Sequence, residues 1–150
     1  MNELLLFSVD SPLQAGIYQE KKLIQTFERQ GRVGEELYPL LEEILEHYEL
    51  SALYHLQGPG SFTAIKLTHL FLRTLSIALK IPLYGTDSFA FNGGAPIKAY
   101  GDSYFIKEDG EIKVIRLPPP PPLTPWKLPL VLEDSLFSLA PEPLYVLPPL

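Results

Sequence analysis

The sequence predicts an α/β protein with a mixed sheet, in which an antiparallel opening meander is followed by parallel strands that helices connect. Three short apolar or alternating segments come first, at 3–10, 14–19 and 22–29. Two long segments with helical periodicity follow, and a further short apolar segment comes after each of them. A strand–helix–strand connection within one sheet is parallel and right-handed, so the later strands extend the meander into a mixed sheet.

The opening segments differ in their hydrophobic pattern. Residues 3–10 are almost continuously apolar up to Asp10, which is typical of a strand buried on both faces. The second and third segments alternate, and Glu20 and Lys21 separate them. This pattern favours a hairpin after the first strand.

Residues 35–50 are predicted to form an amphipathic helix. Apolar residues recur at a spacing of three and four, and four glutamates lie on the opposite face. Pro39 is expected in or near the first turn, where its missing N–H costs little. The apolar positions of this helix are Leu37, Leu40, Leu41, Ile44, Leu45 and Tyr48.

The most regular part of the chain is a strand at 52–56, a Gly-Pro-Gly turn, a helix at 62–80 and a strand at 81–85. Ser61 or Thr63 can cap the helix, which contains neither glycine nor proline. Its two apolar flanks are larger than one sheet face can cover. One narrow polar stripe separates them, formed by Lys66, His69, Arg73, Ser76 and Lys80.

The last third of the chain changes character, because most of the 16 prolines lie there. Five consecutive prolines exclude regular hydrogen-bonded structure and favour an extended segment, either a spacer or a ligand for a proline-reading domain. In order, we expect a short helix from 86 to 91 or 92, strands at 97–106 and 111–117, the proline segment at 118–122, an apolar element at 128–132, a short helix at 134–139 and an apolar element at 144–147.

The composition excludes several classes of function. The chain has no cysteine, which rules out disulfides, thiolate metal sites and a cysteine nucleophile, and fits a cytoplasmic location. A net charge of -6 disfavours direct binding of nucleic acid. The apolar stretches are interrupted by charges and no basic leader precedes them, so we expect no membrane span and no signal peptide.

Two places are candidates for binding a nucleotide. Gly58, Gly60 and Ser61 precede a helix, where free N–H groups and the helix dipole favour an anion. The turn lacks the Gly-Lys-Ser/Thr of a P-loop, so a capped tight turn is the simpler interpretation. Asp10 ends a central strand, where a carboxylate can hold a metal–nucleotide. No second acid ends the strand at 52–56, so a structural role for Asp10 is favoured over catalysis, and the three histidines lack metal-ligand spacing.

The motifs of the chain resemble those of one family. GPGSFT entering a long apolar helix, followed by a strand that begins Ile-Pro-Leu, is similar to the TsaB (YeaZ) family. The segment from Ser8 to Ser11 resembles the family's first-strand Ile-Asp-Thr motif, and 34–41 resembles its His-Ser-Glu-x-Leu-x-Pro helix start. Val33 and Gly34 stand where the His and Ser usually are, so no role passes to those two positions.

This resemblance covers about the first two thirds of the chain and implies an actin-like ATPase or ribonuclease H-like fold. It implies a full first lobe at 1–92 and a reduced second lobe at 93–150. The implied function is that of a non-catalytic cytoplasmic subunit. Such a subunit binds and supports TsaD, the transferase that adds a threonylcarbamoyl group to an adenosine of tRNA. TsaE joins the complex, tRNA is contacted only through partners, and ATP or ADP is expected only at a shared partner interface.

The surplus apolar surface of the helices at 35–50 and 62–80 predicts a protein interface, either a homodimer or the TsaD contact. The alternative is that they are the outer helices of a monomer, with charges in water. The candidate interface residues are Leu37, Leu41, Ile44, Leu45, Phe71, Leu72 and Leu75.

Two other classes of function stay open on the sequence. One is a small actin-like phosphotransferase that uses Asp10 and the turn at 58–61. The other is a self-assembling structural protein with no role in tRNA modification.

Overall fold

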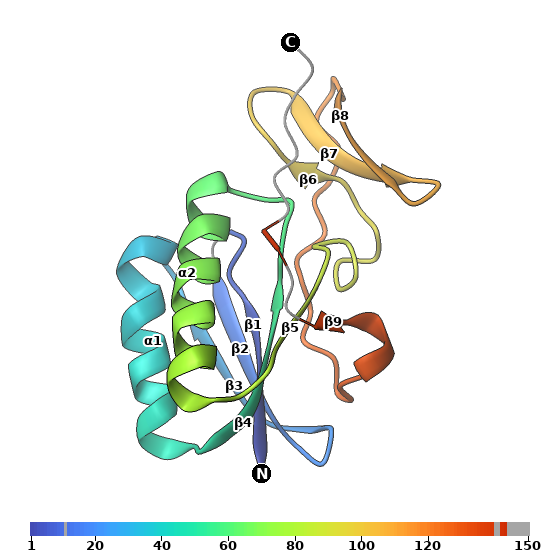
Figure 1. Cartoon of the computed structure of the whole chain (residues 1–150). Coiled ribbons are helices and arrows are strands. Elements are labelled where there is room, and N and C mark those ends of the chain that lie inside the picture. Colours follow the sequence, from blue (N-terminus) through green and yellow to red (C-terminus); the bar gives the residue numbers. More distant parts are fainter. Residues whose placement is uncertain (11, 140–141, 144–150) are drawn as a thin grey trace.

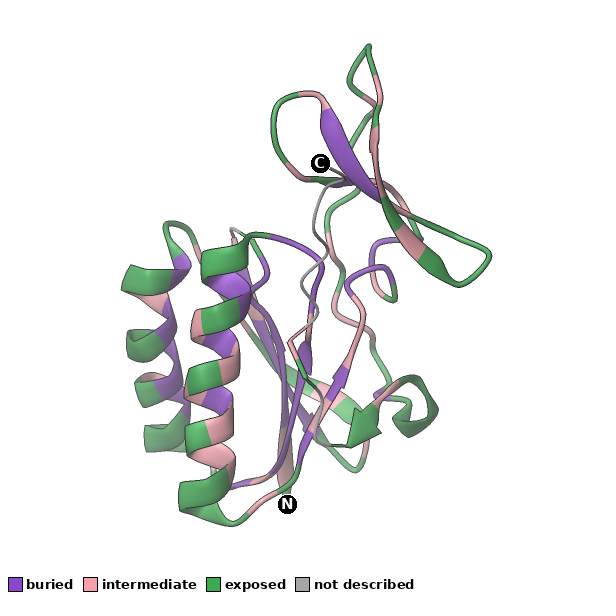
Figure 2. Ribbon diagram, turned by 45° about the horizontal axis from the view of Figure 1, so that its top comes forward, coloured by how far each residue is buried: buried purple, intermediate pink, exposed green. Residues whose placement is uncertain are grey.

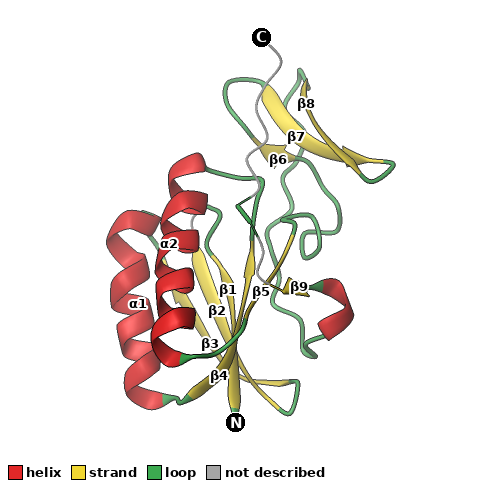
Figure 3. Cartoon of the chain, in the orientation of Figure 1, coloured by secondary structure: helices red, strands yellow, loops and turns green. Residues whose placement is uncertain are grey.

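The computed structural model describes residues 1–10, 12–139 and 142–143. Its larger sheet has six strands in the order β3-β2-β1-β4-β5-β9, and a separate three-stranded sheet has the order β6-β7-β8. Two helices lie side by side on one face of the larger sheet, and the smaller sheet stands at one end of it (Figure 1). Figure 3 shows that loops and turns make up much of the chain outside the two sheets and the two helices.

The opening meander is confirmed. β1 (Asn2–Phe7), β2 (Leu13–Gln19) and β3 (Lys22–Arg29) pair antiparallel in chain order. Glu20 and Lys21 both have positive φ, as a two-residue hairpin of this hand requires.

The parallel part of the sheet is confirmed as well. β4 (Leu50–Leu56) lies parallel to β1, and β5 (Leu83–Thr86) lies parallel to β4. The strand order places β1 and β4 at the centre, which explains why 3–10 and 52–56 are nearly continuous in apolar side chains.

The helix boundaries differ in part from the predicted ones. α1 (Val33–His47) begins before residue 35 and ends before residue 50, because Tyr48 takes an extended conformation and Leu50 already starts β4. α2 (Phe62–Leu79) begins where predicted and ends at Lys80, which adopts a left-handed conformation. The N–H of Ile81 still bonds to the helix carbonyl of Ser76 at 3.1 Å, so the next strand starts later than predicted.

The predictions for the last third are partly wrong. The expected short helix from 86 to 91 or 92 is a series of turns, because an Asp87 carboxylate oxygen accepts the N–H of Phe89 at 2.8 Å and holds a local turn instead. The expected strand at 97–106 is divided in two, because the chain turns at Gly101 with positive φ. The resulting strands are β6 (Ile97–Lys98), β7 (Ser103–Glu108) and β8 (Glu111–Arg116).

Residues 126–139 return to the larger sheet, and we call them the strap. They contain a 3₁₀ turn, Asp134–Leu136, in place of the predicted helix at 134–139, and end in β9 (Ser138–Leu139), which pairs with β5. The strap covers the sheet face opposite the helices (Figure 1). The element predicted at 144–147 lies outside the described residues.

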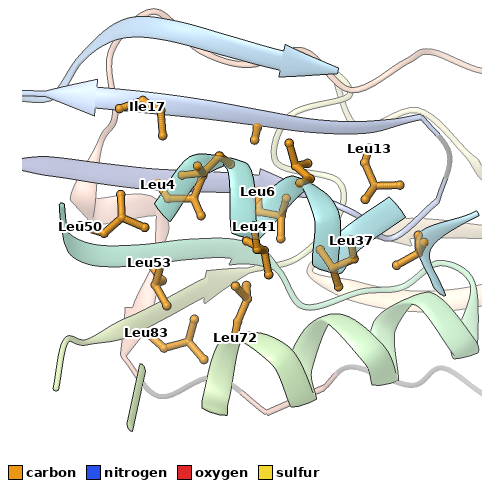
Figure 4. Close-up of a cluster of buried hydrophobic side chains, with 14 of the residues drawn as sticks. Leu4, Leu6, Leu13, Ile17, Leu37, Leu41, Leu50, Leu53, Leu72 and Leu83 are labelled. Atoms are coloured by element: carbon orange, nitrogen blue, oxygen red, sulfur yellow. The ribbon is translucent and has the colours of Figure 1, made fainter. Parts of the chain in front are cut away.

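The main core lies between the helices and the sheet. Figure 4 shows Leu4 and Leu6 of β1, Leu37 and Leu41 of α1, and Leu72 of α2 converging on one cluster. The outer faces of both helices are exposed (Figure 2). By length and composition α2 is apolar enough to cross a membrane, with a mean hydropathy of 1.3, although it packs here beside α1 and the sheet.

Candidate functional site

The two helices each bury one stripe and leave another open. The inward residues of α1 include Leu37, Leu40 and Ile44, none of which is exposed. The buried residues of α2 are Ala64, Ile65, Thr68 and Leu72. Because α2 is apolar on a second flank as well, burial against the sheet leaves apolar side chains along the junction with α1.

This junction forms an open groove with a volume of about 480 Å³. The rings of Tyr38 and Phe71 face each other across it with centroids 6.3 Å apart. Two carboxylates, those of Glu42 and Glu46, line the groove on the α1 side. The apolar lining is Tyr38, Leu41, Leu45, Phe71, Leu75 and Ala78. The groove therefore offers an apolar strip beside carboxylates, which is a surface suited to a partner helix or loop.

A second hollow lies where β1 ends and both helices begin. Its volume is about 660 Å³, and its lining includes Asp10, Arg32, Ser61 and Thr63. The N–H of Ser61 donates to the carbonyl oxygen of Val9 at 3.0 Å, which joins the start of α2 to the end of β1. The structure thus brings together two of the predicted nucleotide-binding residues, Asp10 and Ser61.

The other two predicted residues of this site, Gly58 and Gly60, are buried and do not line the hollow. A Cβ on Gly60 would lie 2.8 Å from the carbonyl oxygen of Val9, so close packing on β1 requires glycine there. Ser61 accepts the N–H of Ala64 at 3.4 Å as the cap of α2. These contacts account for the turn as a structural cap. Ser11, the residue after Asp10, lies outside the described part of the chain.

Known proteins resemble this chain in sequence and in fold. A curated protein of Buchnera aphidicola subsp. Acyrthosiphon pisum, "tRNA threonylcarbamoyladenosine biosynthesis protein TsaB", is 27% identical over 105 residues, which is 64% of this chain and 48% of that protein. The solved structure of YeaZ from Pseudomonas aeruginosa matches with a TM-score of 0.61 and 18% identity, over 84% of this chain and 71% of that one. The resemblance to the TsaB (YeaZ) family is confirmed.

A further solved structure, described as an uncharacterized protein with similarity to peptidase YeaZ from Pseudomonas aeruginosa, matches the TsaB-like fold with a TM-score of 0.60 and 18% identity. It covers 84% of this chain and 70% of that one. No family model matches the chain. The chain spans about half the length of the curated TsaB protein that it matches.

The structure divides the predicted interface residues of this TsaB-like chain into two groups. Leu45, Phe71 and Leu75 line the groove. Leu41, at 5% exposure, lies at the floor of the groove and also contributes to the core. The other three, Leu37, Ile44 and Leu72, are corrected to core positions, because none of them is exposed. Helical spacing identifies an apolar face but does not say which of two adjacent apolar flanks meets the sheet.

Several exposed apolar residues of the helices were not among the predicted interface residues. Tyr38 of α1 is 58% exposed, and Leu70 and Ile77 of α2 are 52% and 70% exposed. Leu70 and Ile77 are seven residues apart and so lie on one face of the helix. That spacing was the available signal for this outer apolar strip of the TsaB-like fold.

His55 of β4 is buried beneath α2, with Nδ1 3.1 Å from the carbonyl oxygen of Leu56. Burial lowers the pKa of His55 to about 4, and the nearby His69 and Arg73 add to the effect. Among the described residues Nε2 has no hydrogen-bond partner, and no group of three or more His, Asp or Glu side chains is placed to hold a metal. His55 is therefore a neutral core residue under α2.

Proposed function

We propose that this chain is a non-catalytic subunit in the biosynthesis of threonylcarbamoyladenosine in tRNA, and that it binds and supports a TsaD-type threonylcarbamoyl transferase. The observation that carries the proposal is the open apolar groove between α1 and α2. The sequence similarity to a TsaB biosynthesis protein supplies the pathway. We place the complex in the cytoplasm, where tRNA is modified.

The exposure of the groove favours a protein partner over solvent. Tyr38 is 58% exposed and Leu45 is 37% exposed, and both adjoin the half-buried side chains of Phe71 and Leu75. Large aromatic and aliphatic side chains of this kind form the centre of protein interfaces, and polar residues form the rim. Glu42 and Glu46 are placed to act as such a rim.

The charges of the two helices also suit a second copy of the chain. α1 exposes Glu42 and Glu46, and α2 exposes Lys66 and Lys80. A two-fold axis beside the helix pair would bring the acidic helix of one copy against the basic helix of the other. A homodimer would then compete with the transferase for the same surface.

The remaining partners are proposed from charge and from the family resemblance. With a net charge of -6, this chain contributes little to tRNA binding, which needs a basic face. We therefore assign tRNA contact to the transferase. The resemblance to the TsaB family implies a TsaE-type partner, to which we assign nucleotide hydrolysis. In this scheme the chain supplies surface and no catalytic group.

The test is to mix the purified chain with the TsaD-type transferase from the same genome and to measure the complex by size exclusion with light scattering. In Leu45→Glu, the new glutamate has a helix propensity similar to that of leucine and places a charge in the groove. It should weaken the complex at least about tenfold, or about 1.4 kcal/mol. Leu130→Glu is the matched control, because Leu130 is 77% exposed on the strap.

A thermal melt of each variant verifies that the fold is retained. Leu41→Glu, in contrast, should unfold the chain, since Leu41 is only 5% exposed. Equal binding by wild type and Leu45→Glu would reject the groove as the binding surface. Absence of any complex with the wild-type chain would reject the proposed partnership.

The hollow beside Asp10 supports a second candidate, a nucleotide shared with a partner. Asp10 offers a carboxylate for a metal–nucleotide, and Arg32 and Ser61 line the same hollow. No lysine is among the described residues that line the hollow, and the two glycines of the turn are buried. These residues make only part of a nucleotide site, so a phosphotransferase that acts alone is less well supported than a shared site.

A further inference from the structure

We infer that residues 93–125 form an inserted module, and that 1–92 and the strap together form one folding unit that carries the partner surface. The sequence predicted two lobes with one boundary, between residues 92 and 93. The contacts of the strap instead indicate two boundaries, one after residue 92 and one after residue 125, because the strap belongs with 1–92.

The two ends of the module meet at a narrow neck. The N–H of Lys127 donates to the carbonyl oxygen of Phe91 at 3.0 Å, and Nε1 of Trp126 donates to the carbonyl oxygen of Ser88 at 2.6 Å. The chain therefore leaves and re-enters the larger unit at adjacent points. Adjacent entry and exit points are the geometry by which one domain tolerates the insertion of another.

Backbone hydrogen bonds attach the strap to both edges of the larger sheet. Near β3, the N–H of Leu23 donates to Leu130 at 3.0 Å and the N–H of Leu132 donates to Lys21 at 2.8 Å. At the other edge, β9 pairs with β5. These contacts pair the start of β3 and part of β5, which would otherwise present unpaired backbone groups.

Side chains attach the strap to the face of the sheet. Leu132 is 2% exposed in a cluster with Leu5 of β1 and Tyr54 of β4. The hydroxyl of Tyr18 donates to the carbonyl oxygen of Pro129 at 2.6 Å. Nζ of Lys21 lies 2.8 Å from a carboxylate oxygen of Asp134. The strap therefore provides the second hydrophobic layer of the six-stranded sheet.

The module, in contrast, contributes few buried side chains. Its buried residues Ile97 and Phe105 share one cluster with Phe89, which precedes the module, and Trp126 at the neck packs against that cluster. β7 and β8 pair along their whole length within the module. With so few buried side chains, the module should open at a lower free energy than the larger unit.

This division bears on the partner surface, and here the inference rests on the proposed function. The strap closes one face of the larger sheet, and the helices cover the other. Among the described residues, the lining of the groove comes from α1 and α2 and not from the module. Partner binding should therefore be independent of whether the module is open or closed.

Native-state hydrogen exchange on the intact chain tests the division. Phe105→Ala removes a buried ring of the module and should speed exchange of the β7 and β8 amides at least about tenfold. The amides of Leu23, Lys127 and Leu132 should change less than about twofold in this variant. Leu132→Ala should speed exchange of the strap amides together with those of β1 and β4.

Equal acceleration of the strap and module amides in Phe105→Ala would overturn the inference, since the chain would then be one cooperative unit. Acceleration of the strap without β1 and β4 in Leu132→Ala would also overturn it. The transferase is then added to wild type and to Phe105→Ala, and equal affinity supports independence of the groove from the module. Lack of binding by both proteins would contradict the proposed function and leave the exchange result intact.

Discussion

The backbone N–H of Ser61 donates to the carbonyl oxygen of Val9 at 3.0 Å, so the helix that forms half of the groove starts directly on the central strand. The contact is possible because residue 60 has no side chain. A Cβ at Gly60 would meet both Cβ and the carbonyl oxygen of Val9 at 2.8 Å. The position of α2 therefore depends on one glycine.

Gly60→Ala should lower the free energy of unfolding by roughly 1–3 kcal/mol, because the backbone has to move away from β1. Urea unfolding followed by circular dichroism measures the change. Gly34→Ala is the control. Its Cβ would lie 3.5 Å from Leu67 in ordinary contact, and alanine favours the helix by up to about 1 kcal/mol. Equal effects of the two substitutions would contradict the role of Gly60.

Asp10→Ala tests the nucleotide candidate. If nucleotide is held only jointly with a partner, the isolated chain should show no saturable ATP binding below about 1 mM by calorimetry. Micromolar ATP binding by the wild-type chain, lost in Asp10→Ala, would instead favour the phosphotransferase.

Stability should fall with acid because of His55. Its pKa is lowered to about 4 in the folded chain by burial, whereas the unfolded chain takes up this proton near pH 6.5. Above pH 6.5 neither state is protonated and the effect vanishes. Between pH 6.5 and 4 the unfolded state binds more protons, so the folded state loses up to about 3 kcal/mol.

Urea unfolding at several pH values measures this loss. His55→Gln should flatten the curve between pH 6.5 and 4. His47→Gln serves as control because His47 is exposed on α1. An unchanged slope in His55→Gln would assign the acid sensitivity to other groups.

Leu132→Ala should cost roughly 2–4 kcal/mol of unfolding free energy, because it leaves a cavity under the strap. Leu130→Ala, two residues away and 77% exposed, should stay within about 0.5 kcal/mol of wild type. The difference in unfolding free energy between the two variants, measured by chemical denaturation, gives the contribution of strap packing. Similar losses would mean that the strap does not seal the sheet.

Elements with a strong period could be predicted closely, although β1 ends at Phe7, three residues before the predicted end at Asp10. Strands β1 to β3 and the start of α2 follow from continuous or alternating apolar patterns and from the Ser61 cap. The start of α1 was missed because Arg32 occupies its N-cap and makes no side-chain capping bond, so the sequence carries no signal there.

The strap could not be predicted, because irregular segments have no hydrophobic period. Its attachment depends on single contacts across more than 100 residues, such as Tyr18 to Pro129. At the groove, the sequence identified two apolar helices correctly. It misassigned Leu37, Ile44 and Leu72, because only the packed structure decides which flank meets the sheet.

The single tryptophan of the chain lies at the neck, with its indole N–H bonded to Ser88. The tryptophan fluorescence of the protein therefore comes from the neck alone, because no other indole contributes. A shift of that emission toward longer wavelength would report separation of the module from the strap in real time, without any attached dye.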